Sequence, residues 1–125
     1  MYRIGEFSQI TELPIKTIRY YDEIGILKPN FVDPFTKYRM YDLKNLEDCK
    51  KIILLKRFGF TLEEIKTMLN GSISEQILED KQLELQEEIR EKQQIVYEIE
   101  IMKDELTKQK EKEPQKVYHM ERKLV

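Results

Sequence analysis

The sequence predicts a mainly α-helical protein: a winged helix-turn-helix head with a small β-hairpin wing, followed by a long coiled-coil helix. Three observations predict this class. Two short segments with helical apolar spacing meet at a tight turn, β-forming residues flank Asp33-Pro34, and residues 75–112 contain neither Gly nor Pro. We therefore divide the chain into a winged helix-turn-helix head (1–71), a coiled-coil helix (72–113) and a tail (114–125).

The charge distribution permits nucleic-acid binding without requiring it. The 125 residues carry a net charge of −2, and 37% of them are charged. Residues 1–70 hold 12 Lys and Arg against 10 Asp and Glu, whereas residues 71–125 hold 10 against 14. A weakly basic head with an acidic tail fits a DNA-binding head on a solvated helix.

The lone cysteine and the lack of long apolar stretches limit the class further. Cys49 has no partner for an internal disulfide, and we expect it to be a small, half-buried core residue. No apolar stretch approaches the roughly 20 residues of a membrane span. The first six residues lack the apolar region of a signal peptide. We expect a cytoplasmic protein that does not contact membranes.

The first two predicted helices form a helix-turn-helix. Apolar residues recur at helical spacing in the first one, at Ile4, Phe7 and Ile10. This helix spans about 5–11, and Thr11-Glu12-Leu13 forms the turn. Pro14 suits the first position of the second helix, which Gly25 ends. Ile15 and Ile18 are expected to face the first helix.

Residues 30–41 predict the wing. Asp33-Pro34 opens a turn because proline presets the backbone angle of the second turn position, and β-forming residues lie on both sides. Two strands alone are marginal in water. We therefore expect the hairpin to pack on the helices through Phe31, Tyr38 or Met40.

A third helix follows the wing. Asp42 is expected to cap it, and it runs to about Arg57. Its expected buried stripe consists of Leu43, Leu46, Ile53 and Leu54. The segments Ile52–Leu55 and Phe58–Phe60 are expected to anchor the core of the head.

A fourth, shorter helix closes the head. Thr61 and Glu64 form a capping-box pattern at its start, and Asn70-Gly71 stops it. Its apolar face consists of Leu62, Ile65 and Leu69.

Residues 75–112 predict one amphipathic helix, on the order of 55 Å long. Apolar residues lie 7, 4, 7, 3 and 7 positions apart, at Leu78, Leu85, Ile89, Val96, Ile99 and Leu106. Lys92 and Lys103 interrupt this heptad pattern. A single helix would leave the stripe in water, so we expect a homodimer in which a second copy covers it.

The tail alternates weakly between apolar and polar residues over 116–125. It is interpreted as the start of a strand whose sheet is absent, and the chain is interpreted as a piece of a longer protein. Such a piece is expected to bind DNA without effector control.

Candidate DNA contacts are concentrated in the second helix, the wing and the end of the third helix. They are Lys16, Thr17, Arg19, Tyr20, Tyr21, Tyr38, Arg39, Lys56 and Arg57. Such side chains bind phosphates and base edges. Arg19 can pair with guanine or, more commonly, contact a phosphate.

Several of these assignments leave alternatives open. Of the adjacent pair Tyr20 and Tyr21, one is expected to pack inward, and Tyr20 is favoured for the contact. Neighbouring strand residues point to opposite faces, so Tyr38 and Arg39 cannot both face DNA in the same way, and Arg39 is favoured. Lys56 and Arg57 form either a contact or a solvated face.

These residues resemble the MerR family of bacterial transcription regulators. The resemblance rests on four ordered segments: Tyr2–Ser8, Thr17–Gly25, Tyr38–Tyr41 and Leu55–Ile65. It is close over about the first 70 residues and extends in type to the long helix.

The resemblance implies that the helix at 14–24 enters the major groove, with residues 30–41 as the first wing and the region around 56–62 as the second. It implies an antiparallel coiled-coil dimer over about 75–112 that binds an inverted repeat in double-stranded promoter DNA. Effector binding would twist and kink a promoter with an unusually long spacer, so that RNA polymerase engages it indirectly. In the multidrug-sensing branch, the effector domain would begin at 116–125.

The sequence argues against several other functions. The resemblance implies that metal-sensing members carry cysteines at the far end of the dimer helix, and no cysteine follows Cys49 here, so metal sensing is not expected. No cofactor is expected. His119 is the only histidine, and no nucleophile–base pair or phosphate loop is present, so an enzyme is not expected and no catalytic residue is assigned. The alternative function is a coiled-coil protein-interaction adaptor whose winged head docks protein instead of DNA.

Overall fold

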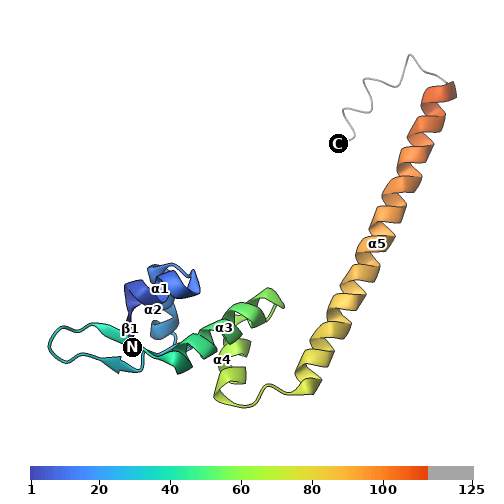
Figure 1. The fold of residues 1–125 in the computed structure, drawn as a ribbon. Coiled ribbons are helices and arrows are strands. Elements are labelled where there is room, and N and C mark those ends of the chain that lie inside the picture. The colour runs from blue at the N-terminus through green and yellow to red at the C-terminus, as the bar shows by residue number, and fades with distance from the viewer. Residues whose placement is uncertain (113–125) are drawn as a thin grey trace. The chain divides into compact units, whose positions relative to one another are not determined.

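The computed structural model describes residues 1–112, which form two compact units that meet between Glu75 and Gln76. The predicted strand at 116–125 lies outside the described residues. The first unit contains four helices and a three-stranded sheet (Figure 1). The helices are α1 (Ile4–Thr11), α2 (Ile15–Glu23), α3 (Leu43–Arg57) and α4 (Leu62–Asn70). The strands are β1 (Tyr2–Arg3), β2 (Phe31–Val32) and β3 (Arg39–Tyr41).

The helix-turn-helix forms as the sequence predicts, apart from the position of Pro14. Glu12 ends α1 in the left-handed region with φ of 63°, and the Thr11 hydroxyl accepts a hydrogen bond from the Leu13 N–H at 3.3 Å. Pro14 lies just before α2, not inside it, with an extended ψ of 145°. Its carbonyl accepts the first helical bond, from the Ile18 N–H at 3.1 Å. Pro14 is therefore the cap residue.

The wing contains a strand that sequence analysis did not predict. The sheet has the order β1-β3-β2, with both pairs antiparallel. Tyr2 pairs with Tyr41, which ties the start of the chain to the return arm of the hairpin. A two-stranded hairpin is only marginally stable in water, and the third strand stabilises it by adding a second antiparallel pair.

The wing also packs through a different residue than expected. Phe31 and Tyr38 are about half exposed, whereas Tyr41 is fully buried. The rings of Tyr41 and Phe7 stack with centroids 4.4 Å apart. The expectation of anchoring through Phe31 or Tyr38 was wrong because alternation along β3 points Tyr41, not Tyr38, toward the helices.

The buried stripe of α3 is also different from the one predicted. Of the predicted stripe, Leu43, Ile53 and Leu54 are exposed by 68%, 40% and 48%, whereas Leu46 packs partly buried against the core as predicted. The residues that α3 buries are Asn45, Cys49, Ile52 and Leu55. The helix carries apolar residues on two faces, so periodicity alone cannot say which face meets the core. Cys49 is fully buried, and this burial raises the pKa of its thiol to about 11.

The caps of α3 and α4 confirm the predicted signals. The Asp42 side chain accepts a hydrogen bond from the Asn45 N–H at 2.9 Å, and this bond lowers the pKa of Asp42. Thr61 and Glu64 form a reciprocal capping box. Both helices therefore begin where the side chain before them satisfies a free backbone N–H.

The long helix α5 (Glu75–Lys112) forms, after its first residue, the described part of the second unit, and it begins at the predicted residue. Many of its apolar side chains are exposed, including all those of the predicted stripe except Leu106, which is half-buried. Within residues 1–112, no helix is both long and apolar enough to cross a membrane.

Candidate nucleic-acid interface

The outward face of α2 carries most of the predicted contacts. Ile18 and Tyr21 point inward, with 0% and 3% of their surface exposed. Lys16, Arg19 and Tyr20 are exposed, and Thr17 is half-buried. The spacing of three between the inward residues leaves the opposite face polar. The helix therefore presents two cations and a phenol on one surface.

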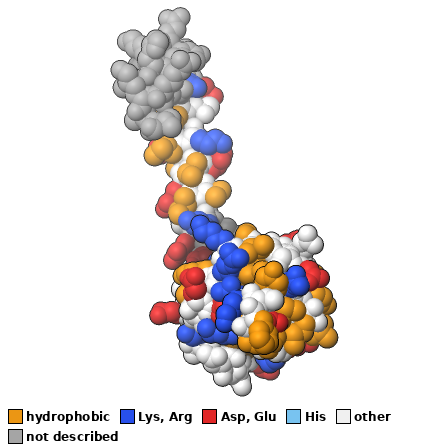
Figure 2. All heavy atoms as spheres, turned by 90° about the vertical axis from the view of Figure 1, so that its left-hand side faces the viewer, with side chains coloured by type: hydrophobic (Ala, Val, Ile, Leu, Met, Phe, Trp, Pro, Cys, Tyr) orange, Lys and Arg blue, Asp and Glu red, His pale blue; other side chains and the backbone are white. Residues whose placement is uncertain are grey.

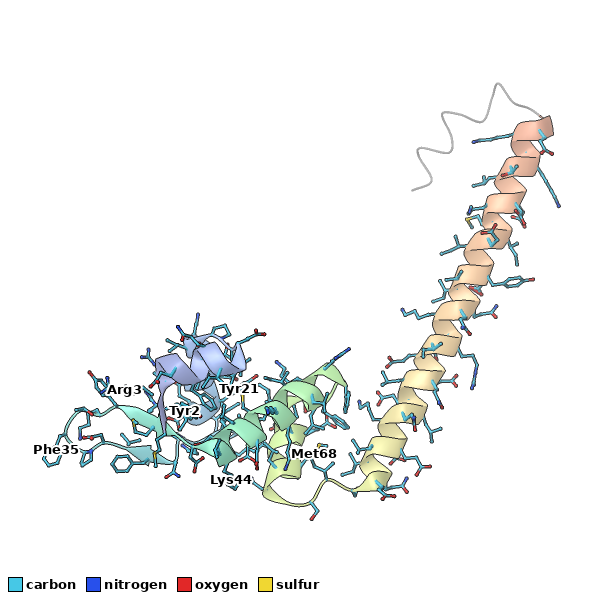
Figure 3. All side chains as sticks on the ribbon, in the orientation of Figure 1. Tyr2, Arg3, Tyr21, Phe35, Lys44 and Met68 are labelled. Atoms are coloured by element: carbon cyan, nitrogen blue, oxygen red, sulfur yellow. The ribbon has the colours of Figure 1, made fainter. Side chains whose placement is uncertain are left out.

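Tyr21 is the predicted site residue that the structure places elsewhere. It is part of the core, and burial raises the pKa of its hydroxyl. Figure 3 shows it beneath α1. Of the two adjacent tyrosines, Tyr20 is thus the outward one, as sequence analysis favoured, and we leave Tyr21 out of the proposed interface.

An ion-pair cluster joins α2 to the wing. The Arg39 Nε donates to Asp22 Oδ2 at 2.9 Å, and the Lys28 Nζ lies 3.2 Å from Asp22 Oδ1. The Asp22 side chain is only 16% exposed. Because only the Nε of Arg39 bonds Asp22, the terminal NH₂ groups have no partner among the described residues. Asp22 thus orients Arg39 and leaves its terminal NH₂ groups available as hydrogen-bond donors.

The two faces of the wing differ in the way that strand alternation requires. Arg39 and Tyr41 point toward the helices, whereas Tyr38 and Met40 lie on the other face. The Tyr38 ring is half exposed, and the Arg3 guanidinium lies over it with Cζ 4.6 Å from the ring centroid. Phe35, at the tip of the wing, is 93% exposed (Figure 3).

The Asp33 turn holds the tip of the wing in shape. Asp33 Oδ1 accepts hydrogen bonds from the N–H groups of Phe35 and Thr36, at 2.8 and 3.0 Å. These bonds lower the pKa of Asp33. The residues at the tip are therefore ordered by local chemistry, as the Asp33-Pro34 sequence predicts.

The turn between α3 and α4 carries the remaining predicted cations. Lys56 and Arg57 are exposed, and neither pairs with a carboxylate among residues 1–112. Gly59 adopts a positive φ of 100°, which lets the chain turn directly after them. Figure 2 shows Lys and Arg side chains gathered in a band across one face of the first unit.

The comparisons with known proteins agree with this geometry. Residues 2–72 match the family described as "MerR HTH family regulatory protein". The chain belongs to the MerR family.

Among its relatives, the multidrug-efflux transporter 1 regulator of Bacillus subtilis is 46% identical over 65 residues, or 52% of this chain and 23% of that protein. The transcriptional regulator BrlR of Pseudomonas aeruginosa is 30% identical over 105 residues, or 79% of this chain and 39% of that protein. The chain thus spans well under half the length of these curated relatives.

Solved MerR structures share the fold. The chain resembles the EcmrR–DNA complex in EcmrR-RPo with a TM-score of 0.71 and 34% identity, covering 90% of this chain and 41% of that one. It resembles the N-terminus of the Bacillus subtilis multidrug transporter activator, MtaN, with a TM-score of 0.74 and 26% identity, covering 82% and 97%.

Sequence reasoning missed three residues of the interface region. Asp22 and Lys28 join the cluster around Arg39, and Arg3 stacks on Tyr38. The pairing of Asp22 with Arg39 spans 17 positions, so no local pattern reveals it. Arg3 could have been found only by predicting β1, which brings the start of the chain onto the wing.

The described residues offer no metal site. No group of three or more His, Cys, Asp and Glu residues lies close enough to hold an ion within residues 1–112.

Proposed function

We propose that this chain is a dimeric, sequence-specific DNA-binding regulator of transcription that distorts promoter DNA in response to an effector. The observation that carries the proposal is the polar face of α2 beside an arginine that the wing holds in place. Lys16, Arg19 and Tyr20 are free to reach base edges and phosphates, while Asp22 fixes Arg39 next to them. A helix and a wing that present such groups together suit one side of a duplex.

The proposed assembly is a homodimer that is clasped by an antiparallel coiled coil of α5. Leu78, Ile89 and Val96 are exposed by 38%, 56% and 66%, and a second copy of the same helix would cover them. A two-fold dimer presents two α2 helices, so we expect it to read an inverted repeat. Arg57 and Lys56 are proposed to contact the DNA backbone from the second wing.

The similarity to transcription regulators supports the parts of the proposal that concern where the chain acts and how it affects RNA polymerase. One solved relative is described as bound to DNA within EcmrR-RPo, and another is a multidrug transporter activator. By analogy, this chain would act in the cytoplasm and affect RNA polymerase indirectly, through the shape of the promoter. It would act by binding alone, without catalysis.

A gel-shift titration against a duplex selected by the chain from random sequences tests this function. We expect an inverted repeat to be selected, and affinity to fall steeply with salt because bound phosphates release counterions. Arg19→Ala should cost about 1–3 kcal/mol if Arg19 reads a base. Glu63→Gln, on α4, is the control and should leave the affinity nearly unchanged. Failure to retain any duplex, together with a protein partner that survives nuclease treatment, would contradict the proposal.

A further inference from the structure

An open groove lies between the start of α1 and the wing. It encloses about 760 Å³. Residues from β1, α1, α2 and the wing line it, among them Arg3, Gly5, Gln9, Ile15, Tyr38 and Arg39. The space beside Gly5 is open, because a Cβ placed there would meet nothing within 4 Å. The groove thus offers space in which a ligand can approach Arg3.

Arg3 is held in this groove by stacking. Its guanidinium lies over the Tyr38 ring at 4.6 Å, and the β1–β3 register explains why. Arg3 is opposite Met40, and Tyr38 lies two residues before Met40, so both side chains share one face of the sheet. An aromatic ring engages the flat face of a guanidinium and leaves the N–H groups at its edge available.

Of the charged groups that line the groove, only Arg3 is a cation without a carboxylate partner among the described residues. Arg39 lines it with its terminal NH₂ groups unbonded among the described residues, because Asp22 bonds only the Nε. The one carboxylate in the lining is Glu6, and it accepts a hydrogen bond from the Arg3 backbone N–H at 3.1 Å. Among the described residues the Arg3 guanidinium therefore has no carboxylate partner, whereas Asp22 balances the charge of Arg39.

The position of the groove beside Ile15, the first residue of α2, indicates its ligand. A recognition helix meets the bases with its N-terminal residues, so the strand that borders the major groove passes close to that end. We propose that the groove binds a phosphate of this DNA strand through Arg3, with Tyr38 positioning the Arg3 guanidinium. This inference rests on the proposed function and adds Arg3 to the proposed interface.

Fluorescence-anisotropy titrations at several salt concentrations test the site, with the 125-residue chain and its selected duplex as the probe. Arg3→Ala should weaken binding about tenfold at 0.1 M salt, since a hydrogen bond to a charged group is lost. The slope of log affinity against log salt should become shallower by roughly 2, because each protomer loses one phosphate contact worth about 0.9.

The matched control is Lys44→Ala. It removes the same charge from α3, where Lys44 pairs with Asp48 at 3.0 Å and does not line the groove. It should leave the salt slope unchanged. An Arg3→Ala slope equal to that of Lys44→Ala would overturn the site, whatever the change in affinity. If that result accompanied strong loss of binding in Arg19→Ala, the proposed function would stand and only this inference would fail.

Two changes of Tyr38 test the positioning role. Tyr38→Phe keeps the ring and Tyr38→Leu removes it, so the salt slope of the Leu variant alone should approach that of Arg3→Ala. Adding Arg3→Ala to Tyr38→Leu should then change the affinity by less than twofold. Fully additive losses in this double-mutant cycle would show that Tyr38 does not act through Arg3.

Discussion

The two units of this chain differ in whether they can bury their own apolar side chains. The head buries a set that includes Phe7, Ile18 and Ile52 at 0% exposure. In α5, Ile89, Val96 and Ile99 remain more than half exposed. A helix stripe of this length is stable in water only against another helix. We therefore expect the head to fold by itself and α5 to need a second copy. The first two changes below test that difference, and two further changes test the head.

The largest effect is expected from placing charges in the α5 stripe. The double change Ile89→Asp and Val96→Asp should abolish dimerisation, because two carboxylates would be buried in each helix. DNA affinity should fall at least 100-fold, since a linked pair of heads gains about 10²–10⁴ over one. Sedimentation and anisotropy measure the two effects.

The control for this change is Gln93→Asp with Gln94→Asp, which adds the same charge outside the stripe. It should remain dimeric. If the stripe variant stayed dimeric and the control variant became monomeric, the dimer interface would lie on the Gln93 and Gln94 side of α5 and not on the apolar stripe.

The next effect concerns the core of the head. Phe7 is fully buried and stacks on Tyr41, so Phe7→Ala should lower the unfolding free energy of the head by about 3–5 kcal/mol. Hydrogen exchange followed by mass spectrometry should show faster exchange in α1–α3 and unchanged exchange in α5. Equal loss of protection in α5 would show that the two units do not fold independently.

A smaller effect is expected at alkaline pH. Burial raises the pKa of the Cys49 thiol from 9.0 to about 11. Above pH 9 the unfolded chain loses this proton while the folded chain keeps it, so stability is present below pH 9 and is lost between pH 9 and 11. The slope from this group is at most about 1.4 kcal/mol per pH unit.

Urea unfolding at pH 8.5, 9.3 and 10 measures this loss. Cys49→Ala should flatten the decline across that range, and Ile53→Ala on the exposed side of α3 should not. An undiminished decline in Cys49→Ala would assign the loss to other groups, such as Tyr41, whose pKa burial raises to about 12.

The smallest effect tests whether Asp22 orients Arg39 in the proposed interface. Asp22→Asn removes a negative charge from α2 and would strengthen DNA binding if only net charge mattered. Because Asp22 orients Arg39 through its Nε, we instead expect weaker binding, by about 1 kcal/mol. Glu23→Gln removes the same charge one residue later and should leave affinity equal or slightly higher. Tighter binding by Asp22→Asn would refute the orienting role.

Local signals in the sequence were enough to place most elements of the fold. Asp42, Thr61 and Gly25 mark element ends because a single side chain or a positive φ decides each one. The helical course of α5 over 75–112 followed from the absence of Gly and Pro. The outward residues of α2 followed from helical spacing. Consecutive residues lie about 100° apart around a helix, so Tyr20 and Tyr21 point in different directions.

Features that depend on distant partners could not be predicted in this way. The two-residue strand β1 forms because it pairs with β3, with Tyr2 opposite Tyr41. Arg3 reaches the interface region only because it lies in that strand. Asp22 and Arg39 meet because α2 and the wing pack together. In α3, both faces are apolar, so only the tertiary contacts decide that Ile52 is buried and Leu54 is not.

The most direct test of this account is the number of chains bound to one inverted-repeat duplex. Sedimentation equilibrium of a fluorophore-labelled duplex with excess protein measures it, since each 15.2 kDa chain adds a resolvable mass. We predict two chains per duplex, bound together without a populated one-chain complex. A complex with one chain, or a chain that stays monomeric and unbound at micromolar concentration, would contradict the account.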